Sequence, residues 1–215
     1  MTEVLVLHHG HGLTAGVRAF AERLRRAGHV VHVPDLFEGR VFDRLEQGID
    51  YAEKVGFGTV VARAVAAAEG LPADLVCLGF SLGVLPAQKL AQTRPGVRGA
   101  LLLEACLPVS EFGGSWPRDV PVQIHGMDAD PFFAGEGDVD AARVLVETAA
   151  DAELFLYPGG SHLFTDSSLP SYDEQAARQV GHRVLDFLDR VGQPRTLAAE
   201  GRPRDRGVGM PGRRP

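Results

Sequence analysis

One serine in the sequence has the neighbours that nucleophilic chemistry requires. Ser81 is the centre of Gly79-Phe80-Ser81-Leu82-Gly83, between an apolar run at 75–78 and a segment at 84–92 that is typical of a helix. A serine in such a sharp strand-to-helix turn projects its hydroxyl from the sheet, and only glycine fits two positions before it and two after it. The N–H of Leu82 begins the helix, where it can face a developing oxyanion. The pattern predicts a nucleophile, against the alternative of a plain glycine-rich turn.

A serine hydroxyl is a weak nucleophile, so it needs a base, and the base needs a carboxylate that fixes its tautomer. His162 is the candidate base, because it follows the last expected strand. Asp128 and Asp130 both follow the strand that ends at His125. We favour Asp130, whose apolar continuation Pro-Phe-Phe suits a buried carboxylate, and Asp128 remains an alternative. The order serine, aspartate, histidine is the order that α/β-hydrolases use.

The loop after the first strand is expected to supply a second oxyanion donor, the backbone N–H of Gly10 or that of His11. A metal site formed by His8, His9 and His11 is disfavoured, because the triad explains the site without a metal. Residues of a binding pocket are expected in the loops beyond the carboxyl ends of the strands. The candidates are His9, His11, Glu104 and Trp116.

The remainder of the chain alternates apolar strand patterns with helical ones, which predicts an α/β fold with a mostly parallel sheet and helices on both faces. Residues 36–56 have no clear period and are expected to pass over the sheet edge. We expect one domain over 1–191 and a disordered basic tail over 192–215. The expected strands are 4–8, 29–33, 75–78, 99–104, 120–125 and 153–157, and the expected helices are 15–27, 57–69, 84–92, 138–150 and 172–191.

Composition narrows the class of protein. The 215 residues are 45% hydrophobic and carry a formal net charge of -6, although six arginines oppose two acidic residues from Gln193 onward. An acidic body argues against nucleic acid as the main partner. Two cysteines, both within apolar stretches, indicate buried thiols rather than a disulfide framework. With no signal-like start and no long apolar run, we expect a cytoplasmic protein that does not enter a membrane.

Four stretches together carry a resemblance to a known family. They are Gly79-Phe80-Ser81-Leu82-Gly83, Val33-Pro34-Asp35-Leu36-Phe37, Gly126 through Asp130-Pro131, and Tyr157-Pro158-Gly159-Gly160-Ser161-His162-Leu163-Phe164.

Over residues 3–190 the sequence resembles the dienelactone hydrolase family of α/β-hydrolases. The resemblance implies a compact hydrolase without a large cap domain that acts on a small-molecule ester or lactone through an acyl-enzyme and without a cofactor. Two features depart from the family. Its namesakes carry cysteine where this chain has Ser81, and its Gly-x-x-Asp spacing is absent, since the third residue after Gly126 is Ala129. The substrate-carboxylate arginines of the family have no identifiable counterpart, so lactone specificity does not carry over.

The leading hypothesis is therefore a serine hydrolase that cleaves a carboxylic ester or lactone through Ser81, His162 and Asp130. Two alternatives use the same fold: a non-catalytic binder of small molecules, with Ser81 as a ligand contact, and a thioesterase or peptidase with the same triad.

Overall fold

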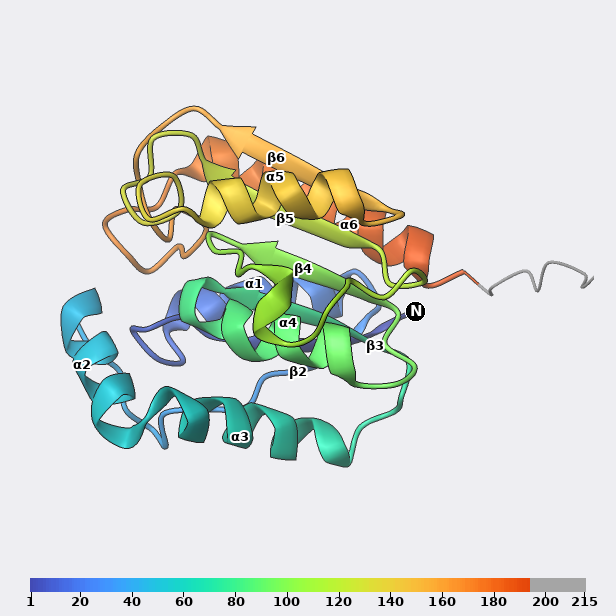
Figure 1. The fold of residues 1–215 in the computed structure, drawn as a ribbon. Helices are drawn as coiled ribbons and strands as arrows, with labels where there is room; N and C mark the ends of the chain where they lie inside the picture. The colour runs from blue at the N-terminus through green and yellow to red at the C-terminus, as the bar shows by residue number, and fades with distance from the viewer. Residues whose placement is uncertain (194–215) are drawn as a thin grey trace, which may run out of the picture.

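The computed structural model describes residues 1–193, and its centre is a sheet of six parallel strands (Figure 1). The spatial order is β2-β1-β3-β4-β5-β6. The chain therefore begins with β1, places β2 beside it as one edge of the sheet, and then adds β3 to β6 in order on the other side of β1. This agrees with the predicted α/β class. The strands are β1 (Glu3–Leu7), β2 (Val30–His32), β3 (Leu75–Phe80), β4 (Gly99–Leu103), β5 (Val122–Met127) and β6 (Ala152–Tyr157).

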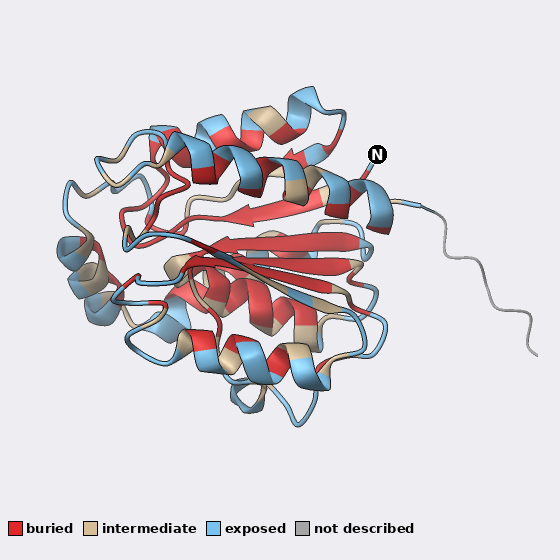
Figure 2. Ribbon diagram, turned by 90° about the horizontal axis from the view of Figure 1, so that it is seen from above, coloured by how far each residue is buried: buried red, intermediate tan, exposed pale blue. Residues whose placement is uncertain are grey.

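Helices cover both faces of the sheet, and each face has its own apolar core. The side chains of α3, α4 and α5 pack on one face, and those of α1 and α6 pack on the other. The inner strands β1, β3, β4 and β5 are buried almost throughout, the edge strands β2 and β6 are partly exposed, and the helices are buried along one stripe (Figure 2). No separate cap domain covers the described part of the chain. The helices are α1 (Ala15–Arg26), α2 (Leu45–Val55), α3 (Phe57–Glu69), α4 (Val84–Thr93), α5 (Asp138–Thr148) and α6 (Glu174–Val191), with short 3-10 turns at Ser81–Gly83 and Val109–Glu111.

The strand register brings the ends of the strands together at one edge. Leu7 of β1 pairs with Gly79 of β3, and Phe80 pairs with Leu103 of β4. Leu103 pairs in turn with His125 of β5, which continues to Met127 beside Tyr157 of β6. Because all the strands run in the same direction, the segments that follow β1, β3, β4, β5 and β6 meet at the carboxyl edge.

Residues 36–56 were expected to pass over the sheet edge, with no helix predicted, and they contain the helix α2. This helix lies at the end of the sheet toward which the strand arrows point (Figure 1). Gly48 of α2 sits against the loop after β1, where an added Cβ would lie 1.7 Å from the carbonyl oxygen of Gly10. Leu45, Ile49 and Ala52 of this helix recur at helical spacing, so the sequence did carry a signal for α2, which the mixed charge of the segment obscured.

The expected basic tail lies outside the described residues from position 194 onward. Within residues 1–193, none of the helices is long and apolar enough to cross a membrane.

Candidate active site

Ser81 occupies a turn that only its glycine neighbours permit. Its φ is 45°, a left-handed conformation that costs energy for a residue with a side chain. A Cβ on Gly79 would lie 2.4 Å from the carbonyl oxygen of Gly83, and a Cβ on Gly83 would lie 2.2 Å from that of Leu7 in β1. The two glycines therefore let β3 turn directly into α4 against β1, and this close approach holds Ser81 at the carboxyl edge of the sheet.

Three side chains that are far apart in the sequence form one hydrogen-bonded series. The Oγ of Ser81 lies 2.9 Å from Nε2 of His162, and Nδ1 of His162 lies 2.7 Å from Oδ2 of Asp130. The His162 side chain is 9% exposed and that of Asp130 is fully buried. A carboxylate that accepts from Nδ1 leaves Nε2 free to accept the serine proton, so this arrangement is suited to a general base.

The two candidate aspartates have different partners. Asp130 holds His162 through Oδ2, and its Oδ1 accepts the backbone N–H of Phe132 at 2.9 Å. Asp128 is exposed and instead accepts the backbone N–H of Gly159 at 3.0 Å, which ties the β5 turn to the β6 turn. Asp130 is therefore the aspartate in contact with the histidine.

The histidines after β1 hold the loop rather than lining the cavity at Ser81. The His11 N–H donates to Nδ1 of His9 at 3.2 Å, and the His11 ring contacts the carbonyl oxygen of Phe42 through Nδ1 at 2.8 Å. The Leu36 N–H donates to Nε2 of His8 at 2.9 Å. Burial lowers the pKa of His8 to about 4 and also lowers that of His9, so both rings are neutral at pH 7.

Glu104 directly follows β4, in a backbone conformation as unusual as that of Ser81. Its φ is 66°, and its side chain is buried. Oε1 accepts from the backbone N–H of Thr165 at 3.2 Å and from the Thr165 hydroxyl at 2.9 Å, three residues beyond His162. Burial raises the pKa of Glu104 to about 7, although the nearby His162 acts in the opposite direction. Leu163, next to His162, also has a positive φ of 60°. Strained backbone therefore concentrates around this site.

A cavity of about 490 Å³ opens beside Ser81 and His162, within the range of small-molecule sites. Trp116 lies elsewhere. It belongs to the apolar core on the α3–α5 face, and its indole N–H donates to the carbonyl oxygen of Val120 at 2.6 Å, so the pocket position expected for it is corrected to a packing role. His9 and His11 are not in the wall either. The cavity is lined by Leu45, Ile49, Phe57, Ser81, Leu82, Leu85, Glu104, Ala105, Leu107, Phe132, Glu136, Asp138 and His162.

Comparison with known proteins agrees with this geometry. Residues 1–192 match the dienelactone hydrolase family. The chain belongs to the dienelactone hydrolase family. Membership in this family indicates a hydrolase. A search of curated proteins found no match.

Three solved structures show how widely this family's fold is shared. A protein from Klebsiella pneumoniae described as a dienelactone hydrolase has a TM-score of 0.66 at 22% identity, over 88% of this chain and 87% of that one. The dienelactone hydrolase-like promiscuous phosphotriesterase P91 from metagenomic libraries has a TM-score of 0.68 at 19% identity, over 89% and 87%. Esterase 2 of Thermogutta terrifontis, phosphonylated by sarin, has a TM-score of 0.63 at 17% identity, over 89% and 84%. At these identities the likeness establishes the α/β-hydrolase fold.

Sequence reasoning missed a buried polar cluster in this member of the dienelactone hydrolase family. Asp166 lies 2.7 Å from Nε2 of His9 and accepts from the hydroxyls of Thr14 at 2.5 Å and Ser168 at 2.6 Å. Because Nδ1 of His9 already accepts an N–H, Nε2 carries the proton and donates to Asp166. The cluster fastens the segment after His162 to the loop after β1. The only sequence signal was the polarity of Asp166 itself, four residues after the histidine.

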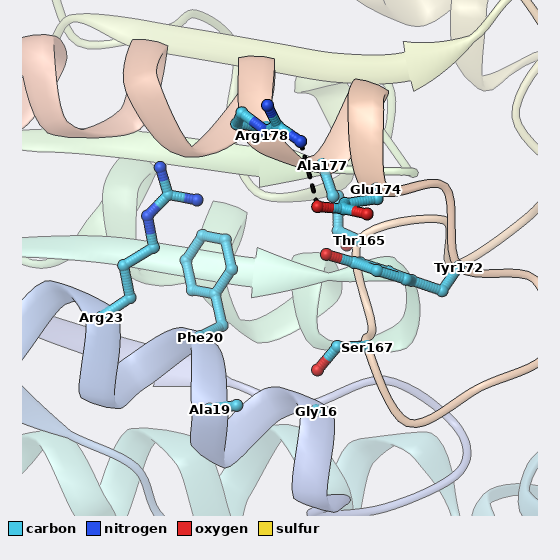
Figure 3. Close-up of a pocket in the computed structure, with 10 residues that line it drawn as sticks. All are labelled: Gly16, Ala19, Phe20, Arg23, Thr165, Ser167, Tyr172, Glu174, Ala177 and Arg178. Atoms are coloured by element: carbon cyan, nitrogen blue, oxygen red, sulfur yellow. Dashed lines mark hydrogen bonds and ion pairs between the residues drawn. The ribbon is translucent and has the colours of Figure 1, made fainter.

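A second hollow of about 290 Å³ lies between α1 and α6 (Figure 3). Arg23 and Phe20 of α1 face it from one side, and Arg178 of α6 is paired there with Glu174 at 3.0 Å. None of the predicted catalytic residues lines it, so the hollow beside Ser81 is the candidate site. Within the described part of the chain, histidine, cysteine and acidic side chains form no cluster of three or more that could hold a metal ion.

Proposed function

We propose that the protein is a serine hydrolase that cleaves a carboxylic ester or lactone through an acyl-enzyme. The observation that carries the proposal is the series Ser81 Oγ, His162 Nε2, His162 Nδ1 and Asp130 Oδ2, with separations of 2.9 and 2.7 Å beside an open cavity. Such a series activates a hydroxyl that is otherwise unreactive at neutral pH.

In the first half of the reaction, His162 takes the Ser81 proton as the hydroxyl oxygen attacks the acyl carbon. The imidazolium that forms is stabilised by the Asp130 carboxylate and then gives its proton to the departing alcohol. In the second half, His162 deprotonates a water molecule that attacks the acyl-enzyme, and Ser81 recovers its proton when the acid leaves.

The oxyanion of each tetrahedral intermediate accepts hydrogen bonds from the N–H groups of Leu82 and Gly10. Leu82 lies in the 3-10 turn that leads into α4, where the first N–H groups lack partners within the helix. We favour Gly10 over His11 because the His11 N–H already donates to His9 in a buried hydrogen bond.

The test is covalent labelling by a fluorophosphonate probe, followed by mass spectrometry of the labelled peptide. One protein with a similar fold has been captured phosphonylated by sarin, which supports an organophosphorus reagent as the probe. We expect the label on Ser81 and at least a 100-fold slower reaction in His162→Ala, since the hydroxyl then lacks its base. Ser110→Ala removes an exposed hydroxyl outside the cavity and should label like the parent protein.

A folded protein that stays unlabelled, and that hydrolyses p-nitrophenyl acetate no faster than Ser81→Ala, would refute the proposal. That result would favour a non-catalytic binder. Labelling at Ser81 with turnover of thioesters or peptides but not of oxygen esters would keep the triad and replace the substrate class.

A further inference from the structure

Within residues 1–193, the wall of the cavity at Ser81 contains acidic side chains and no lysine or arginine. Eight of its residues are apolar, and three carry a carboxyl group: Glu104, Glu136 and Asp138. Among the described residues in this wall there is no lysine or arginine, and His162 is the one group that can become cationic. The cavity therefore offers apolar surface and negative potential, with no group to balance an anionic ligand.

One carboxyl oxygen of Glu104 accepts hydrogen bonds, and the other has no hydrogen-bond partner among the described residues. Oε1 accepts both hydrogen bonds from Thr165, whereas Oε2 is buried and lacks a partner within residues 1–193. A buried polar atom without a partner is costly, and among the described residues that line this cavity Oε2 of Glu104 is the one such atom. Glu104 is one of the residues that line the cavity, and its left-handed backbone and the two hydrogen bonds from Thr165 fix the position of its carboxyl group.

The other two carboxyl groups extend the same potential along the cavity. Oδ2 of Asp138 accepts the backbone N–H of Cys106 at 2.9 Å, which fixes it at the start of α5. Glu136 is exposed two residues earlier, in the segment that enters this helix. The negative groups thus run from the buried wall at Glu104 to the α5 side of the cavity.

We propose that the cavity selects neutral and ammonium-bearing apolar esters and excludes esters that carry a carboxylate, with Glu104 as the residue that receives the substrate's hydrogen-bond donor. This inference rests on the proposed ester hydrolysis at Ser81 and names the substrate class of that site. A carboxylate would lose its hydration on entry and would meet three carboxyl groups and no cation. An ammonium group would find in Oε2 the acceptor that is otherwise unpartnered.

The experiment compares three p-nitrophenyl esters with acyl chains of equal length: hexanoate, 6-aminohexanoate and the half-ester of adipate. In the parent protein at pH 8 we expect kcat/KM for the 6-aminohexanoate ester to exceed that for the adipate half-ester at least tenfold, with hexanoate above adipate. Glu104→Gln should reduce the preference for the ammonium ester over hexanoate at least fivefold. Glu147→Gln makes the same change of charge on an exposed residue of α5 outside the cavity and should leave that preference unchanged.

The preference should also depend on pH in a way that the triad does not explain. Burial raises the pKa of Glu104 to about 7, so its carboxylate is more populated at pH 8 than at pH 6, while an alkyl ammonium stays protonated. The ratio of the ammonium ester to hexanoate should therefore rise across this range. His162 and Asp130, which face Glu104, serve the hydrolysis of both esters alike, so their contribution cancels in the ratio. Glu136 and Asp138 share the cavity with Glu104, and Glu136→Gln measures the part of Glu136 through a change at an exposed residue.

Equal hydrolysis of the adipate and 6-aminohexanoate esters by the parent protein would overturn the inference and leave the proposed ester hydrolysis intact. Loss of all turnover in the parent protein, or turnover that survives Ser81→Ala, would instead overturn the proposed function and this inference with it. If Glu104→Gln does not fold, the three-ester series in the parent protein and in Glu136→Gln still decides the matter, because the expected discrimination against adipate is measured there directly.

Discussion

Asp130→Asn should almost abolish hydrolysis because the new amide would reverse the protonation of His162. In the structure, Oδ1 of Asp130 accepts the N–H of Phe132 at 2.9 Å and Oδ2 accepts from Nδ1 of His162 at 2.7 Å. The backbone N–H of Phe132 can only donate, so the amide oxygen of the introduced asparagine must turn toward it. The amide NH₂ then faces His162 and donates to Nδ1. The imidazole proton moves to Nε2, which can no longer accept the proton of Ser81.

The expected loss follows from this wrong tautomer. The same change in proteases with a Ser-His-Asp triad lowers kcat about 10⁴-fold, which corresponds to about 5.5 kcal/mol of transition-state stabilisation. Asp128→Asn is the matched control, because Asp128 is exposed and its side chain accepts a hydrogen bond from the backbone N–H of Gly159 rather than from His162. We expect less than a tenfold change there.

The assay is kcat/KM for p-nitrophenyl hexanoate at pH 8, with circular dichroism and urea unfolding to show that both variants are folded. The reasoning would be refuted if the folded Asp130→Asn protein retained more than about a tenth of the activity. It would also be refuted if Asp128→Asn were the more damaging change.

Three further predictions concern stability, each measured by urea unfolding. Gly83→Ala should lower the free energy of unfolding by at least about 2 kcal/mol, because the added Cβ would lie 2.2 Å from a backbone carbonyl oxygen of β1. Gly58→Ala in α3 is the control, because Gly58 has open space around it and the substitution should not destabilise the protein. Equal losses of stability in the two variants would contradict the packing argument. Asp166→Ala should cost about 2 to 6 kcal/mol at pH 7, because buried donors including His9 lose their acceptor. Burial of Asp166 favours its neutral acid, but hydrogen bonds, led by the one from His9, outweigh burial and lower the pKa of Asp166 to about 2, below its ordinary 3.8. The ionised form therefore contributes about 2 kcal/mol of stability above pH 4, and this contribution is lost as the pH falls toward 2. A stability difference between Asp166→Ala and the parent that stays constant over this range would count against this role of Asp166. Burial shifts the pKa of Glu104 the other way, from 4.5 to about 7, so the parent protein should lose up to about 3 kcal/mol of stability as the pH rises from 5 to 8. In Glu104→Gln the stability should change less with pH. The same pH dependence of stability in the two proteins would show that Glu104 does not titrate in this range.

The sequence by itself determined the features that depend on neighbours along the chain. Apolar runs separated by helical periods specified the alternation of strands and helices, and parallel strands then had to place their following segments at one edge. The glycines around Ser81 were decisive because a sharp turn restricts Cβ atoms locally, whatever the remainder of the chain does. The order of serine, aspartate and histidine along the chain followed from the same alternation.

Tertiary structure decided what depends on direction and on partners from distant segments. The sequence favoured Asp130 over Asp128 but left both open, and the turn after β5 is what aims Asp130 at His162. Packing placed Trp116 in the core, which its position in an expected loop did not indicate, and it seated α2 against the loop after β1. The spare oxygen of Glu104 exists because Thr165, 61 residues away in the chain, engages only the other oxygen. Local periodicity specifies which face of an element is buried, whereas the partner of a polar atom is set by the packing of whole elements against one another.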